Sequence, residues 1–360
     1  MKNLSFRHFL FLFLLNRFKG DRTIKSVFHL LNGKRSSQTI QDIKWYGLTE
    51  FFSMLPTWKL SVFEQETKWM ENHLFIINSD NKAHMTKKGN IIVENYFNNY
   101  DWPPQVNGWK YGQTAAIFWK RLALLVQCLS FSLEENRSYV PVFDDRDIQQ
   151  WLKQRWPRNK KDKKEMAFHL YNELFILLDK IPEKDAFLFT HRLSGHQHTG
   201  KTIQQLAGLM NQDPDESYFR FQATLHYLLA NAHQTTYLKD TAAGLLQKHV
   251  LTDTAKKTNM YLQKGLTIQE IAAIRGLKRS TIEDHIVELA SEGTDFIIDI
   301  YVSNHLQKDI MDTVQRIRTY RLKLIKEALE SENVHADYFS IRVTLAYFGG
   351  IHENARTLSI

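Results

Sequence analysis

Apolar residues recur every three or four positions along much of this 360-residue chain, a spacing that strongly constrains its fold. The pattern is clearest in residues 122–131, 166–178, 219–229 and 314–329. Such spacing places apolar side chains on one face of an α-helix. Convincing strands are few, and the best are residues 74–77 and 83–85 around a polar turn, which predict a short hairpin. We therefore expect a mainly α-helical protein.

The length of the chain predicts two or three domains. The Pro-rich segment 101–105 follows a predicted helix and suits a boundary, and residues 239–258 form a softer one. We predict an N-terminal winged-helix-like domain at 1–104, a helical middle domain at 105–250 and a helix-turn-helix domain at 251–360.

Charge and cysteine content limit the classes of function. The net charge of +8 suggests an acidic partner such as nucleic acid. The single cysteine, Cys128, excludes an internal disulfide framework and a Cys-based zinc finger. It lies in an apolar stretch, so we expect a small buried hydrophobe rather than a nucleophile.

The N-terminal apolar run 9–15 follows Lys2 and Arg7 and resembles a secretory signal. It is much shorter than the roughly 20 residues of a membrane span, and no cleavage site of small residues follows it. We predict a buried first helix. We find no other stretch long and apolar enough to span a bilayer, and we expect a cytoplasmic protein.

The most specific motif lies in residues 254–290. Thr267 and Glu270 have the spacing of a capping box, and the helix that they open should stop near Gly276. Ser280 and Glu283 have the same spacing and should open a second helix. A short helix, a Gly-containing turn and a capped second helix are typical of a helix-turn-helix.

The second helix of such a motif enters the major groove of DNA by its N-terminal end. The predicted DNA-binding residues at this end are Arg275, Lys278, Arg279, Ser280, Thr281 and His285. We expect Thr281, Asp284, His285 and Glu288 on the exposed face of the helix. Three carboxylates, of Glu283, Asp284 and Glu288, would repel a polyanion. A helical hairpin that binds protein is therefore the alternative.

Residues 23–96 have the order of a winged helix. Three predicted helices precede the hairpin. The first ends at Gly33, the second starts after Ser36 or Ser37, and the third is opened by a capping box of Ser61 and Glu64. In this winged helix we predict that Lys82, Lys87 and Lys88 contact DNA phosphates. The alternative is a structural winged helix that docks a protein.

Residues 264–285, with 325–329 and 338–342, resemble the helix-turn-helix at the C-termini of some bacterial RecQ helicases. Residues 30–35, 69–70 and 85–89 are similar to the winged helix that follows the RecQ motor; an aromatic wedge at the wing tip, found in some members, is missing from residues 78–82. The whole chain resembles the YpbB-type proteins of Gram-positive bacteria. The resemblance implies a non-enzymatic DNA-binding accessory protein acting with a RecQ-type helicase in DNA repair or recombination, without a cofactor. A sequence-specific transcriptional regulator is the alternative.

Residues 195–202, GHQHTGKT, match the P-loop pattern and suggest a nucleotide-binding protein. The context opposes it, because no series of strands surrounds the loop. Thr202 instead suits the first helix of a second helix-turn-helix.

Two clusters could suggest metal ligands. We interpret the histidines at 191, 196 and 198 as surface residues, and Asp144, Asp145 and Asp147 as the capped start of a helix. The basic run 153–164 reads as a solvated face or a phosphate-contacting strip.

Overall fold

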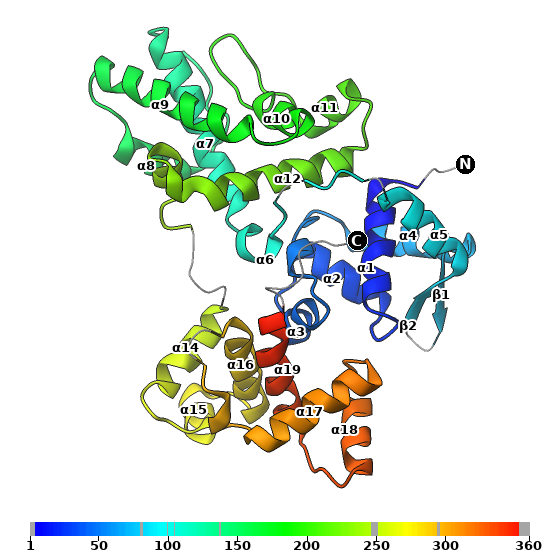
Figure 1. Cartoon of the computed structure of the whole chain (residues 1–360). Helices are drawn as coiled ribbons and strands as arrows, with labels where there is room; N and C mark the ends of the chain where they lie inside the picture. The colour runs from blue at the N-terminus through cyan, green and yellow to red at the C-terminus, as the bar shows by residue number, and fades with distance from the viewer. Residues whose placement is uncertain are drawn as a thin grey trace. The chain divides into compact units, whose positions relative to one another are not determined.

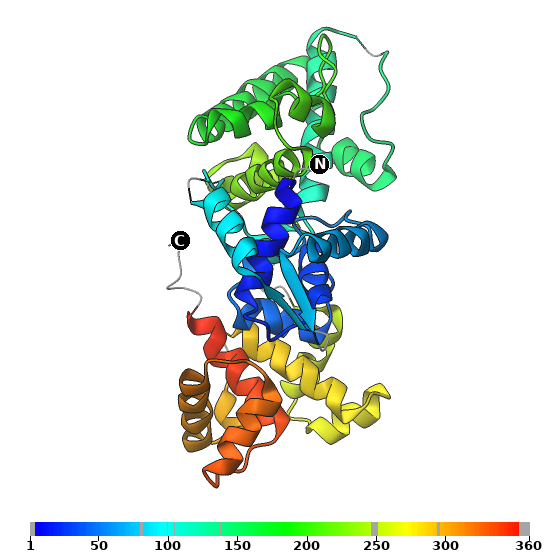
Figure 2. The same ribbon diagram turned by 90° about the vertical axis from the view of Figure 1, so that its right-hand side faces the viewer.

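The computed structural model describes residues 4–79, 82–98, 100–103, 105–136, 138–245, 251–293 and 296–352. The fold is mainly α-helical, as predicted, and the sheet in the described chain is one two-stranded hairpin (Figures 1 and 2). The chain divides into two compact units. Unit 1 comprises residues 1–10, 50–56 and 99–248, and unit 2 comprises residues 11–49, 57–98 and 249–360. The three predicted domains remain a prediction.

Unit 1 is built from helices alone in its described residues. Its elements are α6 (Gly108–Tyr111), α7 (Ala115–Leu133), α8 (Arg146–Arg155), α9 (Lys160–Leu178), α10 (Glu183–Thr190), α11 (Ile203–Leu209), α12 (Pro214–Asn231), η2 (Ala232–Gln234) and α13 (Tyr237–Thr241). Helix α12 packs against α7, α10 and α11, and α7 packs against α8 and α9 (Figure 1). The apolar faces predicted from the spacing of residues 122–131 and 219–229 thus meet in one core.

A fully buried ion pair lies within this core. The Arg220 guanidinium of α12 donates from Nε to Asp185 of α10 at 2.6 Å, and both side chains have no exposed surface. Arg220 also donates to the backbone carbonyl of Asp101 at 2.7 Å. Buried charges need this degree of pairing because desolvation of an isolated charge is costly.

Helix α7 corrects one expectation from the sequence. It has the length and composition of a membrane span, although we expected no such stretch beyond the N-terminus. Half of its 18-residue apolar window is buried inside the protein. Burial of this kind is typical of the core helix of a protein, so the length and composition of α7 are weak evidence that it crosses a membrane.

Unit 2 combines segments from both ends of the sequence. Its elements are α2 (Ile24–Asn32), α3 (Ser37–Trp45), α4 (Leu60–Asn72), β1 (Ile76–Ser79), β2 (Lys82–Met85), α5 (Lys87–Phe97), α14 (Asp253–Leu262), α15 (Ile268–Arg275), α16 (Arg279–Glu292), η3 (Ile298–Ile300), α17 (Asn304–Ile317), α18 (Leu322–Ser331) and α19 (Tyr338–His352). Helix α1 (Phe6–Arg17) and the short η1 (Thr49–Phe51) contain residues of both units. Residues 10–15 of α1 are all buried, as predicted for this apolar run.

The N-terminal part of unit 2 follows the predicted winged-helix order. Ser36 caps α3 by accepting from Thr39 N, and Thr86 caps α5 by accepting from Gly89 N. Strands β1 and β2 pair antiparallel with Ile76 opposite Met85. The expected capping box at Ser61 is wrong, because the N-cap of α4 is Lys59, two residues before the serine. The wing-tip residues 80–81 lie outside the described chain.

Helix α16 is the central helix of unit 2. It packs against α14, α15, α19 and the N-terminal helix α3, and α19 lies alongside it in both views (Figures 1 and 2). Seven consecutive residues of α3, Thr39 to Trp45, are buried in this arrangement. The two segments that the sequence suggested as separate DNA-binding modules therefore share one packed body.

Candidate nucleic-acid interface

Helices α14, α15 and α16 form the predicted helix-turn-helix. The Thr267 hydroxyl accepts from Glu270 N, and the Glu270 carboxylate accepts from Thr267 N at 2.8 Å, so the predicted capping box is confirmed. Helix α15 ends at Gly276, whose φ of 60° lies in the left-handed region. Glycine adopts this conformation without the steric cost that a Cβ brings. Gly276 therefore lets the chain turn directly into α16.

The apolar faces of α15 and α16 hold this turn in place. Ile271 of α15 and both Ile282 and Ile286 of α16 are fully buried. They belong to a core that includes Val343 and Ala346 of α19. The orientation of α16 is consequently set by packing on several sides, not by the turn alone.

The accessible part of α16 is its N-terminal end. Lys278, Arg279 and Ser280 are exposed, and residues 281, 283 and 284 are half-buried. Residues 285–291 are all buried. A helix that presents only its first two turns can meet DNA by its end, which is how recognition helices approach the major groove.

Two residues expected on the exposed face of α16 are buried instead. His285 is 6% exposed and its ring nitrogens lie 2.9 Å and 2.8 Å from the hydroxyls of Thr254 and Thr258 of α14. Glu288 is 7% exposed and accepts from Thr252 Oγ1 at 2.9 Å. The expectation was wrong because α14 covers this face of α16.

Burial shifts the pKa of both side chains toward the neutral form. The pKa of His285 is lowered, first by burial and then by the nearby Arg275 guanidinium. The pKa of Glu288 is raised by burial, against the hydrogen bonds from Thr252. The burial of His285 leaves it no route to a DNA groove, so its predicted DNA contact does not fit this structure.

Arg275 has a different environment from the one that the sequence suggested. Its guanidinium donates to the Thr254 carbonyl at 3.0 Å and to the Thr254 hydroxyl at 3.0 Å, and it also donates to the Thr258 hydroxyl. These bonds fasten α15 to α14. A phosphate contact by Arg275 would compete with them.

Of the three carboxylates that argued against DNA contact, two are ion-paired and one is buried. Glu283 pairs with Arg279 of its own helix at 2.8 Å, and Asp284 pairs with Arg342 of α19. Glu288, the third, is buried away from the surface. Because the two ion pairs are neutral, the positive charge of Lys278 remains at the exposed end of α16. Arg342 was outside our predicted site, because its sequence separation from Asp284 hides the pair.

The other predicted site lies on the wing of unit 2. Lys87 is exposed at the start of α5, and Lys82 is half-buried at the start of β2. Lys88 is exposed, but its ammonium donates to the His73 carbonyl at 2.9 Å and lies 4.6 Å from the Phe75 ring centre. The structure keeps these three lysines within one short segment, and their contact with DNA remains a prediction.

The second helix of this N-terminal module is occupied by protein contacts. Lys44 of α3 lies 3.3 Å from Glu292 of α16, and both side chains are largely buried. Arg342 donates to Gln41 of α3 at 3.3 Å. Helix α3 thus packs against α16. Sequence patterns within the N-terminal segment or the C-terminal segment could not indicate this contact.

The GHQHTGKT loop of unit 1 does not form a phosphate cradle. A P-loop needs free backbone N–H groups that converge on phosphate. Here Gly195 N, Gly200 N and Lys201 N donate to His198 O, Ser194 Oγ and His191 O at 2.8–3.0 Å. Residues 186–189, which would be the preceding strand, belong to helix α10.

The remaining polar clusters have structural partners. Asp145 caps α8 by accepting from Ile148 N, as predicted, and pairs with Lys120 at 2.9 Å. The His196 ring contacts Asn136 at 3.1 Å. Within the described ranges, no three His, Cys, Asp or Glu side chains gather in a way that could hold a metal ion. Cys128 is half-buried and not fully buried as expected, and burial raises the pKa of its thiol.

Comparison with known proteins agrees with the geometry of unit 2. Residues 254–345 match a family described as a helix-turn-helix domain. The chain is 35% identical over 335 residues to protein YpbB of Bacillus subtilis strain 168, covering 92% of this chain and 94% of that protein. No solved structure matches the chain.

Proposed function

This chain belongs to the YpbB family, and from that premise we propose that it is a non-catalytic DNA-binding accessory protein of the cytoplasm. We further propose that it acts with a RecQ-type helicase in DNA repair or recombination. The helix-turn-helix domain at 254–345 supports DNA binding. The observation that carries the proposal is the exposed N-terminal end of α16, where both nearby carboxylates are ion-paired.

The physical argument starts from charge. The N-terminus of a helix has unpaired N–H groups and a positive dipole, which favour phosphate. Lys278 and Arg279 stand at that end of α16 and are exposed. An incoming phosphate would meet Lys278 first, and could draw Arg279 from its surface pair with Glu283, since such pairs are weak.

The short accessible part of α16 separates this proposal from a sequence-specific regulator. Reading bases directly requires several side chains along the helix to reach the groove. Residues 285–291 are buried, so at most the first two turns are available. Contact dominated by phosphates and by DNA shape is therefore favoured over recognition of one sequence.

The DNA-binding proposal is tested by removing the two cations. Lys278→Ala with Arg279→Ala should weaken binding to duplex or forked DNA about tenfold, from two contacts of about 0.5–1 kcal/mol each. The slope of log affinity against log salt should become shallower by about 1 to 2. Lys308→Ala with Lys323→Ala, on α17 and α18, removes the same charge from the same unit as a control. Equal effects of the two double variants would contradict the assignment.

The helicase proposal needs its own experiment, because it is supported only by the resemblance of both ends of unit 2 to RecQ modules. We expect a purified RecQ-type helicase from the same organism to co-purify with the chain and to unwind forked DNA faster in its presence. Unwinding that is unchanged, together with no co-purification, would remove the helicase and leave the DNA-binding proposal standing.

A further inference from the structure

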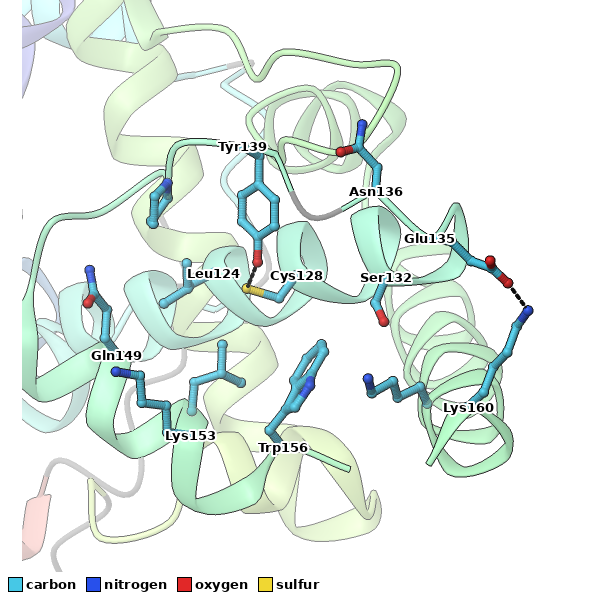
Figure 3. A pocket seen from close by; sticks show the side chains of 13 residues that line it. Leu124, Cys128, Ser132, Glu135, Asn136, Tyr139, Gln149, Lys153, Trp156 and Lys160 are labelled. Carbon is cyan, nitrogen blue, oxygen red and sulfur yellow. Dashed lines mark hydrogen bonds and ion pairs between the residues drawn. The ribbon is translucent and has the colours of Figure 1, made fainter. Parts of the chain in front are cut away.

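Unit 1 contains a pocket of about 870 Å³ between α7, α8 and the start of α9 (Figure 3). Lysines from α8 and α9 stand around it, and aromatic and sulfur-containing side chains line its interior. Its lining includes Cys128, Tyr139, Lys153, Trp156, Lys160 and Lys163. None of these residues belongs to the helix-turn-helix, so the pocket is a separate feature.

The chain at this pocket is unusually basic. Seven of the twelve residues from 153 to 164 are Lys or Arg, and one, Asp162, is acidic. Three of the seven, Lys153, Lys160 and Lys163, line the pocket. A cleft lined by one sign of charge concentrates ligands of the opposite sign.

Helix stability does not explain this arrangement. Asn159 caps α9 by accepting from Asp162 N, and lysines occupy positions 160, 161, 163 and 164 immediately afterwards. The helix dipole makes cations unfavourable in the first turn of a helix, by about 0.3–1 kcal/mol each. Residues that lower the stability of a helix, as these lysines do, are expected where a function requires them.

Aromatic rings accompany the lysines. The Trp156 side chain is half-buried and points into the pocket toward the Cys128 and Ser132 side of α7 (Figure 3). The Lys163 ammonium lies 5.2 Å from its ring centre. Tyr139 reaches in from the loop after α7 and donates from its hydroxyl to Cys128 Sγ at 3.0 Å. The pocket thus offers a ring for stacking beside cations for phosphate.

One carboxylate faces the pocket and must be included. Glu135 pairs with Lys160, and both side chains are mostly exposed, at 70% and 58%. Exposed pairs of this kind contribute little, so a phosphate can replace the carboxylate as the partner of Lys160. Lys153 and Lys163 remain as cations on the other sides.

We propose that this pocket binds single-stranded nucleic acid, with an unpaired base against Trp156 and the adjoining phosphates against Lys153, Lys160 and Lys163. Base stacking beside a cationic groove is how proteins hold single strands without sequence preference. Duplex DNA does not fit this chemistry, because its bases are stacked and paired. The basic run continues outside the pocket at Lys161 and Lys164, which favours a strand over a free nucleotide.

The test uses fluorescence anisotropy of labelled oligothymidine, 20 nucleotides long, with the full chain. Lys153→Ala with Lys163→Ala should weaken binding about tenfold and leave duplex binding unchanged. Lys180→Ala with Lys239→Ala is the matched control, since it removes two exposed charges from the same unit outside the basic run and the pocket. Equal losses in the two double variants would overturn the pocket as the site. Thermal unfolding by circular dichroism verifies that each variant is folded.

The role of the base is tested with an abasic oligonucleotide of the same length. The wild type should bind it at least fivefold more weakly, because stacking contributes about 1–3 kcal/mol per base. Trp156→Leu should bind both oligonucleotides alike. Thymidine monophosphate that binds as tightly as the oligonucleotide would overturn the single-strand assignment in favour of a free nucleotide.

These outcomes are independent of the proposed function. Lys278→Ala with Arg279→Ala should retain oligothymidine binding even where duplex binding falls. Loss of both in that variant would place single-strand binding at α16 and contradict the pocket.

Discussion

Two helix pairs in this chain begin alike and continue differently. Thr202 and Thr267 each open a short helix, α11 and α15, through a complete capping box. The helix that follows α11 starts with carboxylates, and Asp213 at its N-cap accepts from Phe6 N at 3.1 Å. The helix that follows α15 starts with exposed Lys278 and Arg279.

The difference teaches which part of a helix-turn-helix pattern indicates DNA binding. The capping boxes fix the start of the first helix in both pairs. The charge and exposure of the second helix then decide whether a polyanion can approach. Helix α12 has acidic residues at its start and serves as a core helix, whereas the start of α16 is open and cationic. We therefore expect substitutions around α12 to change the stability of the protein, and substitutions around the start of α16 to change its DNA binding.

The largest expected effect is on the buried pair that holds α12. Asp185→Asn removes the closest and only fully buried of the three carboxylates that pair with the Arg220 guanidinium, the others being Asp101 and Glu216. It should lower the free energy of unfolding by about 3 kcal/mol. Urea denaturation followed by circular dichroism measures the change. Lys120→Ala, which breaks a more exposed pair with Asp145, should cost at most about 1 kcal/mol. A loss below about 1 kcal/mol for Asp185→Asn would show that α12 is not held as described.

A smaller effect is expected from pH. His226 of α12 is buried, and burial lowers its pKa to about 3. In the unfolded chain the pKa is near 6.5, so below that pH the unfolded state binds a proton that the folded state does not. The stability contribution is thus complete above pH 6.5 and falls by about 2 kcal/mol at pH 5.

Denaturation at pH 7.5 and pH 5.0 checks this sign. The wild type should lose about 2 kcal/mol more than His226→Gln over that range. His226 Nδ1 accepts from Asn107 N at 3.2 Å, a bond that the Gln oxygen can take over. Identical losses in the two proteins would mean that His226 is protonated in the folded state at pH 5.

The smallest expected effect concerns the compensated carboxylates of α16. Arg342→Ala frees the charge of Asp284, and duplex binding should weaken severalfold, by about 1 kcal/mol. Arg342→Ala with Asp284→Asn should restore most of the affinity, because the uncompensated charge is removed. Anisotropy at low salt measures both. Failure of the second change to restore binding would show that Arg342 acts on α16 by packing or by direct contact with DNA.

Local features of unit 2 were predictable from the sequence because local interactions create them. The Thr267 capping box, the turn at Gly276 and the β1–β2 hairpin each depend on residues within about ten positions. The Ser61 and Ser280 boxes failed for one shared reason. In both cases the helix starts at the residue before the serine, two residues earlier than predicted, so the serine is the second helical residue and cannot be the N-cap.

The exposure of α16 could not be predicted in the same way. Periodicity identified the face with Ile282 and Ile286, but α14, α19 and α3 cover further faces. Those contacts join residues that are up to about 300 positions apart, as between Gln41 and Arg342. The pairing of Asp284 with Arg342 and the burial of Glu288 against α14 also depend on distant contacts, so the sequence alone showed these carboxylates as an objection to DNA binding.

Hydrogen–deuterium exchange of the full chain, with and without a 20-base-pair duplex, tests the central comparison most directly because both helix pairs are followed in one sample. We predict that duplex DNA slows exchange of backbone amides at residues 276–283 and leaves residues 210–217 unchanged. Slower exchange at 210–217 with no change at 276–283 would contradict the assignment of DNA binding to α16.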